Sequence, residues 1–379
     1  MQRVFPRPLS NADRRRGRQA RARVSSQGVN AELGTRNPER TYAAAGVDIA
    51  AAEDNVRRIA RHVRSTHGPS VLGSFGAFAG LFHLRDVRDA VLVASTDGVG
   101  SKVLLGIQLG HYELLGRDLV NLSVNDVLTA GARPLFFLDY VGLHSIDAAV
   151  MDALVSGMAA ACRENACALL GGETAQLPDV YAPGHLDLVG TIVGVVERGA
   201  EIDGSRVEQG DRVWGLPSTG LHTNGYTLAR QVISGIDLAS DPDGRLGQSL
   251  GDALLAPHPG YYRLLEPLLP RLTAIAHITG GGIPGNLPRV LPESVSVELD
   301  WGAWQVPPIF SLLQELGGVP FDEMLRVFNL GLGLIFVAEP TLDPRAACPS
   351  AVEVGRVVPR RDERVIINRT PSTSGRGLG

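Results

Sequence analysis

Residues 90–102 read AVLVASTDGVGSK, and this stretch decides how the fold is interpreted. The short apolar run 90–95 is followed at once by Asp97-Gly98, which is typical of a buried strand that ends in a tight turn. In α/β folds, ligands collect beyond the carboxyl ends of strands, where backbone N–H groups are free. A carboxylate there is a hard oxygen ligand suited to Mg²⁺. The stretch therefore predicts an α/β fold with Asp97 at a ligand site; the alternative is a purely structural Asp-Gly turn.

Lys102, at the end of the same stretch, is the one lysine among the 36 basic residues of the sequence, and the other 35 are arginines. The ammonium group of lysine is a compact point charge, whereas the guanidinium of arginine is a planar fork. A chain that uses arginine wherever a general cation suffices favours a specific role for Lys102. We expect Lys102 to be catalytic and to contact phosphate beside Asp97; the alternative is a chance lysine on the surface.

A polar stripe runs along the helix predicted for about residues 111–130. At 100° per residue, four side chains share an arc of about 80°, Asp118, Asn121, Asn125 and Thr129, and Asp126 lies beside it. Short carboxylates and carboxamides are costly to bury without partners. We therefore expect the stripe to face a cation or a polar ligand; the alternative is capping and internal hydrogen bonding.

A further acid follows two glycines in residues 169–174, LLGGET. The glycines permit close backbone approach at this turn. We expect Glu173 to converge with Asp97 and Asp126, and three carboxylates at one place repel one another unless a cation lies between them. These acids therefore predict a Mg²⁺ site.

Two glycine turns occur in the second half, residues 218–225 (STGLHTNG) and 277–282 (HITGGG). Each is predicted to join a strand to a helix, whose first N–H groups bind phosphate readily. His222 is suited to orienting an anion or moving a proton near neutral pH, and a capping role is the alternative. The sequence has neither a P-loop nor a Rossmann fingerprint, which disfavours those nucleotide-binding folds.

Charge is unevenly distributed. Residues 1–40 hold ten arginines and three acids, a net charge of +7, so the remainder carries −11 because the whole chain is −4. An acidic body argues against a general nucleic-acid-binding surface. The basic segment lacks apolar periodicity and is predicted to be a disordered, dispensable tail; a transit peptide or an RNA-binding arm is the alternative. Residues 369–379 are predicted to form a second disordered tail.

Other classes of protein are excluded by composition. No apolar run approaches the ~18 residues of a membrane helix, and the three cysteines have no CxxC spacing, which disfavours a disulfide scaffold or a zinc ribbon. We expect a soluble cytoplasmic protein with no membrane partner. Strands and helices mix in both halves, which predicts two α/β (α+β) domains with mixed sheets, residues 41–205 and 206–368.

At these residues the chain resembles the phosphoribosylformylglycinamidine cyclo-ligase family, over about residues 41–367. The resemblance rests on an ordered set of motifs, of which FFLDY and HTNGY are the most specific: GVD at 46–48, TDGVG at 96–100, VND at 124–126, FFLDY at 136–140, GGET at 171–174, HTNGY at 222–226, HITGGG at 277–282 and VFN at 327–329. The chain departs from the family pattern at 73–76, GSFG instead of GGFG, and at 219–223, TGLHT instead of a pattern with Pro-His-Ser.

The resemblance implies a homodimer whose N-terminal domains join their strands into a β-barrel. It also implies ATP with Mg²⁺ as cofactors, and conversion of formylglycinamidine ribonucleotide to aminoimidazole ribonucleotide with release of ADP and phosphate. On this basis Lys102, Asp97 and His222 are candidate catalytic residues, and Asp97, Asp126 and Glu173 are candidate metal ligands. The candidate ATP- and substrate-binding residues are Gly98, Gly100, Asp118, Asn121, Asn125, Thr174, Asn224, Thr279, Gly280, Gly281 and Gly282.

Two other functions fit part of this pattern. One is another ATP-dependent kinase of the same superfamily, of the thiamine monophosphate kinase or selenophosphate synthetase type; the latter needs a reactive cysteine near the N-terminus, whereas the first cysteine here is Cys162. The other is a nucleotide-binding regulator without turnover, which the retained acids and Lys102 disfavour.

Overall fold

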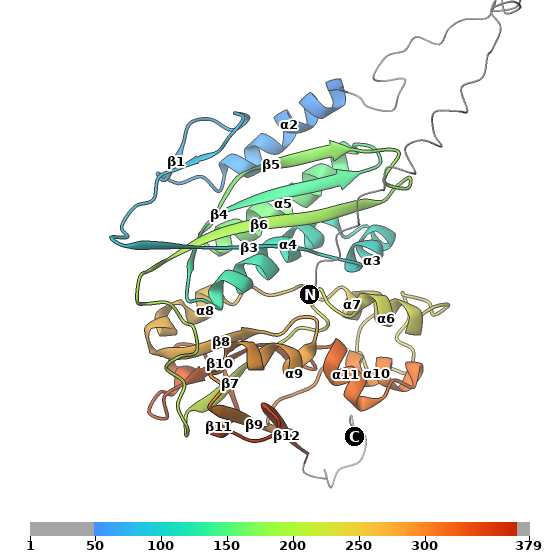
Figure 1. Cartoon of the computed structure of the whole chain (residues 1–379). Coiled ribbons are helices and arrows are strands. Elements are labelled where there is room, and N and C mark those ends of the chain that lie inside the picture. Colours follow the sequence, from blue (N-terminus) through green and yellow to red (C-terminus); the bar gives the residue numbers. More distant parts are fainter. Residues whose placement is uncertain (1–48, 370–379) are drawn as a thin grey trace, which may run out of the picture. The chain divides into compact units, whose positions relative to one another are not determined.

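The computed structural model describes residues 49–369. The predicted tail at 1–40 lies outside these residues, and so does the predicted C-terminal tail from Thr370 onward. The described part contains two large sheets, one from each half of the sequence (Figure 1).

The first sheet has four strands in the order β3 (Ala90–Gly98), β6 (Leu186–Glu197), β4 (Arg133–Leu143) and β5 (Ala168–Gln176). The pairs β3–β6 and β6–β4 are antiparallel, and β4–β5 is parallel. A two-stranded ribbon, β1 (Val71–Leu72) with β2 (Leu81–Phe82), lies apart from this sheet in the pairing order. Strands β3 and β5 are therefore the open edges of the sheet.

Helices cover one face of this sheet (Figure 1): α2 (Ile49–Arg64) and α5 (Ala148–Glu164) contact β5, and α4 (Tyr112–Leu128) contacts β3, β4 and β6. Two glycines let α4 and α5 approach closely. A Cβ on Gly116 would lie 2.0 Å from the Leu154 carbonyl oxygen, and one on Gly157 would lie 1.9 Å from the Glu113 carbonyl oxygen. Any larger residue at either position would force these helices apart.

The second sheet has six strands in the order β12 (Val365–Arg369), β9 (Val295–Trp301), β11 (Val352–Pro359), β7 (Arg212–Pro217), β10 (Leu332–Ala338) and β8 (Leu272–His277). All neighbouring pairs are antiparallel except β12–β9. Strand β10 is buried along its whole length, which explains its continuous apolar sequence. The accompanying helices are α6 (Tyr226–Val232), α7 (Leu250–Leu254), α8 (Tyr262–Leu265), α9 (Gly282–Asn286), α10 (Pro308–Gly317) and α11 (Phe321–Val327), with 3₁₀ turns η1 (Glu266–Arg271), η2 (Leu287–Val290) and η3 (Pro344–Ala346).

The predicted mixed α/β architecture is confirmed, and the helix expected at about 111–130 is α4. Two local expectations differ. The turn after β3 is followed at once by helix α3 (Lys102–Leu109), and the helix predicted after the second glycine turn is only the short α9 followed by η2. Within one chain the four-stranded sheet is open, so the barrel implied by the resemblance is not formed by a single chain.

Across residues 49–369, none of the helices has the length and apolar character needed to span a bilayer. Cys162, Cys167 and Cys348 are free thiols and are buried.

Candidate active site

Lys102 lies in the protein interior. Its side chain is fully buried, and its Nζ is 2.6 Å from Oδ2 of Asp118, which is also fully buried. Nζ also donates to the carbonyl oxygen of Ala256 at 2.9 Å, in the loop of residues 256–261, here called the clamp loop. Burial by itself lowers the pKa of Lys102 and raises the pKa of Asp118, and the ion pair opposes both shifts. In this structure Lys102 joins α3 to α4 and the clamp loop and does not line the polar pocket, and its contact with phosphate stays a prediction.

Side chains of the polar stripe of α4 bond to the backbone of the same clamp loop. Asp118 Oδ1 accepts the N–H of His258 at 2.7 Å, and Asn121 Nδ2 donates to the carbonyl oxygen of His258 at 2.8 Å. Asn125 Nδ2 donates to the carbonyl oxygen of Pro259 at 2.9 Å. Internal hydrogen bonding, the alternative stated for this stripe, is what the structure shows. Asp118, Asn121 and Asn125 are thus bonded to protein groups in this structure, and their ligand-binding role stays a prediction.

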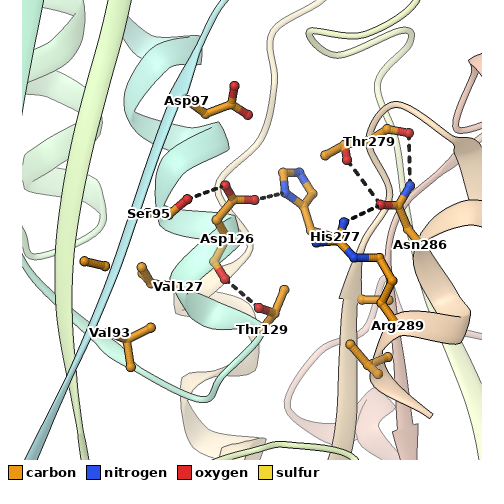
Figure 2. A pocket seen from close by; sticks show the side chains of 13 residues that line it. Val93, Ser95, Asp97, Asp126, Val127, Thr129, His277, Thr279, Asn286 and Arg289 are labelled. Carbon is orange, nitrogen blue, oxygen red and sulfur yellow. Dashed lines mark hydrogen bonds and ion pairs between the residues drawn. The ribbon is translucent and has the colours of Figure 1, made fainter. Parts of the chain in front are cut away.

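Asp97 and Asp126 line a polar pocket of about 480 Å³ between the first sheet and β8. Asp126 Oδ1 lies 2.9 Å from His277 Nδ1, and Asp126 Oδ2 accepts a hydrogen bond from Ser95 Oγ at 2.9 Å (Figure 2). The Asp97 carboxylate lies beside this group and has no cationic side chain bonded to it in residues 49–369 (Figure 2). The pocket is completed on its other side by Thr279, Asn286 and Arg289.

The electrostatics of this pocket favour a cation. Burial, with a contribution from the nearby Asp126 carboxylate, raises the pKa of Asp97, while the N–H of Gly98 and the His277 ring oppose the shift. A divalent cation would relieve the repulsion between these two neighbouring carboxylates, and their oxygens are suitable ligands for it. Asp97 and Asp126 therefore fit Mg²⁺ by their donor chemistry.

The second glycine turn forms one wall of the pocket. Gly281 and Gly282 have φ angles of 100° and 60°, and a Cβ on Gly282 would lie 1.8 Å from the Leu325 carbonyl oxygen, so this position requires glycine. Asn286 Nδ2 donates to carbonyl oxygens of the turn, and Arg289 donates to Asn286 Oδ1. Thr279 and the Arg289 guanidinium thus line the pocket opposite the two acids, which is a suitable arrangement for an anionic group.

The first glycine turn lies deeper. His222 is fully buried, adopts a φ of 60°, and its Nδ1 has no hydrogen-bond partner in the described part of the chain. Burial lowers the pKa of His222 well below its usual value, and the neighbouring His277 and Lys102 add to the effect. The His222 ring stacks on the His258 ring, with ring centroids 4.2 Å apart, and it does not line the polar pocket. Its predicted direct catalytic role therefore lacks support from this geometry.

Glu173 departs from the expectation of three converging acids. It lines two other pockets, one of about 840 Å³ beneath the loop of residues 74–80, which is rich in phenylalanine, and one of about 330 Å³ beneath α2. Both also contain Asp139, whose pKa is raised to about 7 by burial and by the charge of Glu173. Among residues 49–369 no group of three or more histidine, cysteine or acidic side chains has metal-binding geometry. One chain therefore brings together Asp97 and Asp126 but not Glu173.

The remaining predicted binding residues lie in three places. Gly98 ends β3 and donates its N–H to Asp97 at 2.7 Å, and Gly100 follows with a φ of 66°. Thr174 lines the small pocket beneath α2 with Glu173. Asn224 lies near the second turn, since a Cβ on Gly280 would be 3.3 Å from its Oδ1.

Three residues that line the pocket, and one buried behind it, were missed from the sequence. Ser95 precedes Asp97 by two positions in a strand, so the alternation of the strand places both on one face and is a usable signal. Asn286 and Arg289 follow the second glycine turn closely in GNLPR. His258, between two prolines, has no local pattern that identifies it.

Comparisons with known proteins agree with this architecture. Residues 79–196 match the family described as AIR synthase related protein, N-terminal domain, and residues 208–368 match its C-terminal domain. Among solved structures, thiamine-monophosphate kinase from Stenotrophomonas maltophilia superposes with a TM-score of 0.61 at 20% identity, over 84% of this chain and 96% of that one. Hydrogenase maturation protein HypE in complex with ATP gives a TM-score of 0.58 at 17% identity, over 81% and 88%. These structures share the fold.

Curated relatives are much closer in sequence. The phosphoribosylformylglycinamidine cyclo-ligase of Sorangium cellulosum is 48% identical over 314 residues, which cover 81% of this chain and 90% of that protein. The enzyme of the same name from Myxococcus xanthus is 47% identical over 332 residues, covering 84% and 95%. The chain belongs to the AIR synthase related proteins and, within them, to the phosphoribosylformylglycinamidine cyclo-ligase family.

Proposed function

We propose that the chain is an ATP-dependent cyclo-ligase of purine biosynthesis that converts formylglycinamidine ribonucleotide to aminoimidazole ribonucleotide, with release of ADP and phosphate. The observation that carries the proposal is the polar pocket in which Asp97 and Asp126 face Thr279 and Arg289, in a chain nearly half identical to cyclo-ligases over most of its length. A pocket with acids on one wall and an arginine on the other suits a phosphoryl group with its counter-cation.

The chemistry needs activation of a poor leaving group. The formyl oxygen of the substrate attacks the γ-phosphorus of ATP, the bond to the β,γ-bridging oxygen breaks, and ADP leaves. The amidine nitrogen then adds to the activated carbon, and phosphate departs with the former formyl oxygen as the ring closes. Because both steps are governed by position and charge, the protein contributes alignment and electrostatic stabilisation.

Different residues of the pocket would bind the metal ion, bind the phosphate oxygens and orient the metal ligand. Asp97 and Asp126 would hold Mg²⁺, which neutralises charge on the transferring phosphoryl group. Arg289, anchored to Asn286 at 3.3 Å, and Thr279 would bind phosphate oxygens from the opposite wall. His277 lies between the two walls, bonded to Asp126, and keeps that carboxylate oriented.

We further propose a homodimer. Helices cover one face of the four-stranded sheet, while Leu92 on the other face is 63% exposed, and Phe136, Leu138 and Val193 there are only partly buried. A second copy that joined its sheet to this one would cover that face and pair both open edges, as closure of a barrel requires. The β5 edge of one chain, with Glu173, would then meet the second copy, so Glu173 remains a candidate metal ligand in the dimer.

The test is an assay of ADP release with purified protein, ATP and Mg²⁺, comparing formylglycinamidine ribonucleotide with thiamine monophosphate. We expect ADP release and aminoimidazole ribonucleotide formation in equal amounts with the first substrate. Turnover of thiamine monophosphate instead would show a kinase of the same fold. Binding of ATP without turnover of either would show a nucleotide-binding regulator. Sedimentation of the same preparation measures the dimer directly.

A further inference from the structure

Asn286 lines the polar pocket, yet only 4% of its surface is exposed. It is the last residue of α9, and its side chain lies between Thr279 of the second glycine turn and Arg289 of η2 (Figure 2). These two neighbours are the residues to which the proposed function assigns phosphate oxygens. A buried amide that touches both either binds the ligand itself or acts through them, and its hydrogen bonds decide which.

The amide nitrogen of Asn286 is bonded to the backbone of the glycine turn. One hydrogen of Nδ2 serves the carbonyl oxygen of Gly282 at 2.9 Å, and the other is shared between the carbonyl oxygens of Thr279 at 3.2 Å and Gly280 at 3.3 Å. A carbonyl oxygen only accepts, so a flipped amide would place Oδ1 against three acceptors. The orientation of the amide is therefore fixed, and Nδ2 has no hydrogen left for a ligand.

The amide oxygen of Asn286 is occupied as well. Oδ1 accepts a hydrogen bond from the hydroxyl of Thr279 and another from Nη1 of Arg289, each at 3.3 Å. An amide oxygen has two lone pairs, and each of these two donors takes one. Asn286 therefore lines the pocket without any hydrogen-bonding capacity left for a ligand. Its contacts can affect a ligand only through the two neighbours that it holds.

Arg289 keeps most of its donors for an anion. The residue is exposed, and within residues 49–369 its guanidinium bonds only to Asn286, through Nη1, so that Nε and Nη2 remain free. An exposed arginine without an anchor loses side-chain entropy when a ligand orders it, and the bond to Oδ1 restricts its rotamers beforehand. The hydroxyl of Thr279 rotates about its C–O bond, so a phosphate oxygen can take its hydrogen while Asn286 still holds Arg289.

We propose that Asn286 is a positioning residue for the phosphate-binding wall of the pocket: its Oδ1 holds the guanidinium of Arg289 and the hydroxyl of Thr279 in place, and it does not itself touch the ligand. The inference rests on the proposed function for the chemical class of the ligand, a phosphoryl group. The two ends of the amide act together, because the bonds of Nδ2 to the turn are what aim Oδ1 at Arg289.

A double-mutant cycle separates this role from simple support of the turn. The probe is adenylyl imidodiphosphate, an ATP analogue that is not hydrolysed, titrated with Mg²⁺ into the full-length protein in a calorimeter. Arg289→Ala is expected to weaken binding at least about tenfold, because hydrogen bonds to a charged group are lost. Asn286→Ala is expected to weaken binding about fivefold in the parent and less than about twofold in the Arg289→Ala background, where there is no guanidinium to position.

The other outcomes of this cycle are equally informative. A residue that only supports the turn would weaken binding by the same factor in both backgrounds, and this result would overturn the proposal, as would unchanged binding in Asn286→Ala. The expected coupling in a protein that releases no ADP with formylglycinamidine ribonucleotide would reject the proposed function and leave this inference standing. A parent protein that does not bind the analogue would reject both.

A spectroscopic measurement on the unmodified protein covers the case in which Asn286→Ala folds poorly. The probe is ¹⁵N-arginine-labelled protein without ligand, with the Arg289 signals assigned by their absence in Arg289→Lys. A hydrogen bond from Nη1 slows rotation about the Cζ–Nη1 bond, so we expect the two Nη1 hydrogens of Arg289 to give separate signals. A single averaged signal would show a guanidinium that Asn286 does not hold, and it would contradict the proposal whatever the activity of the protein.

Discussion

Two polar clusters meet at α4, and they are built from the same residue types with opposite outcomes. In one, Lys102 and Asp118 are fully buried and every contact is made within the protein. In the other, Asp97 and Asp126 lie on a pocket of about 480 Å³, and Asp97 has no cationic partner in the described part of the chain. Residue type therefore does not distinguish a ligand site from a structural network. The two are distinguished by whether the polar side chains already have partners within the protein, because a side chain that is bonded to protein groups is not free to bind a ligand.

The largest expected effect belongs to the buried cluster. Lys102→Met would leave Asp118 as an unpaired buried charge, and we expect the free energy of unfolding to fall by about 3–5 kcal/mol in urea denaturation. The matched control is Lys102→Met with Asp118→Leu, which removes both charges and should recover much of the loss. A single variant as stable as the parent would show that the ion pair does not hold α3 to α4.

The pocket should respond in the opposite way. Asp97→Asn is expected to reduce kcat about 100-fold or more while leaving the urea midpoint unchanged, because an exposed pocket carboxylate serves the ligand rather than the core. Asp179→Asn, at an exposed residue that lines neither the polar pocket nor those of Glu173, is the control and should behave like the parent. Near-normal ADP release from Asp97→Asn would remove Asp97 from the proposed metal site.

Lys102→Arg tests the buried cluster by changing the shape of the side chain without changing its charge. The charge is kept, but the wider guanidinium must enter a space with no exposure, so we expect a loss of about 1–3 kcal/mol in stability from overpacking. Below the unfolding transition, kcat should change little. A lysine that contacts phosphate would give the reverse result. A large loss of ATP turnover at unchanged melting temperature would therefore show that Lys102 contacts phosphate.

The smallest effect is a pH dependence at Asp139. Its pKa is raised to about 7 in the folded chain, so the native state keeps a proton that the unfolded state has already lost above its usual value of 3.8. Stability of the parent therefore falls as pH rises between these two values. Asp139→Asn should remove that fall. Above pH 7 we expect the free energy of unfolding of the variant to exceed that of the parent by about 1 kcal/mol, a figure reduced for the partial solvent access of this side chain. Melting curves at several pH values measure it; parallel curves for parent and variant would refute it.

Particular residues show how much of the fold and of the site can be predicted from the sequence. Strand β3, the turn after it and helix α4 follow from local periodicity, because their patterns are set by neighbours in the chain. The pairing of Asp126 with His277 spans 151 positions, and no local pattern encodes it. The stripe on α4 was recognised as polar and in need of partners, yet its partners are backbone groups of the clamp loop, and backbone groups leave no trace in a sequence. For Lys102 the rarity of lysine indicated a special environment, but not that this environment was the interior.

The clamp loop also constrains the order in which the protein can form. Asp118 bonds to the N–H of His258, a residue 140 positions later, so on the ribosome the polar stripe of α4 emerges long before its partners exist. Until then its carboxylate and amides must remain hydrated, and α4 cannot complete its buried packing on that side. Contacts of such long sequence separation are entropically late in folding. A nascent chain paused before residue 258 would thus display a water-exposed strip of Asp and Asn along α4, a surface that the finished protein never shows.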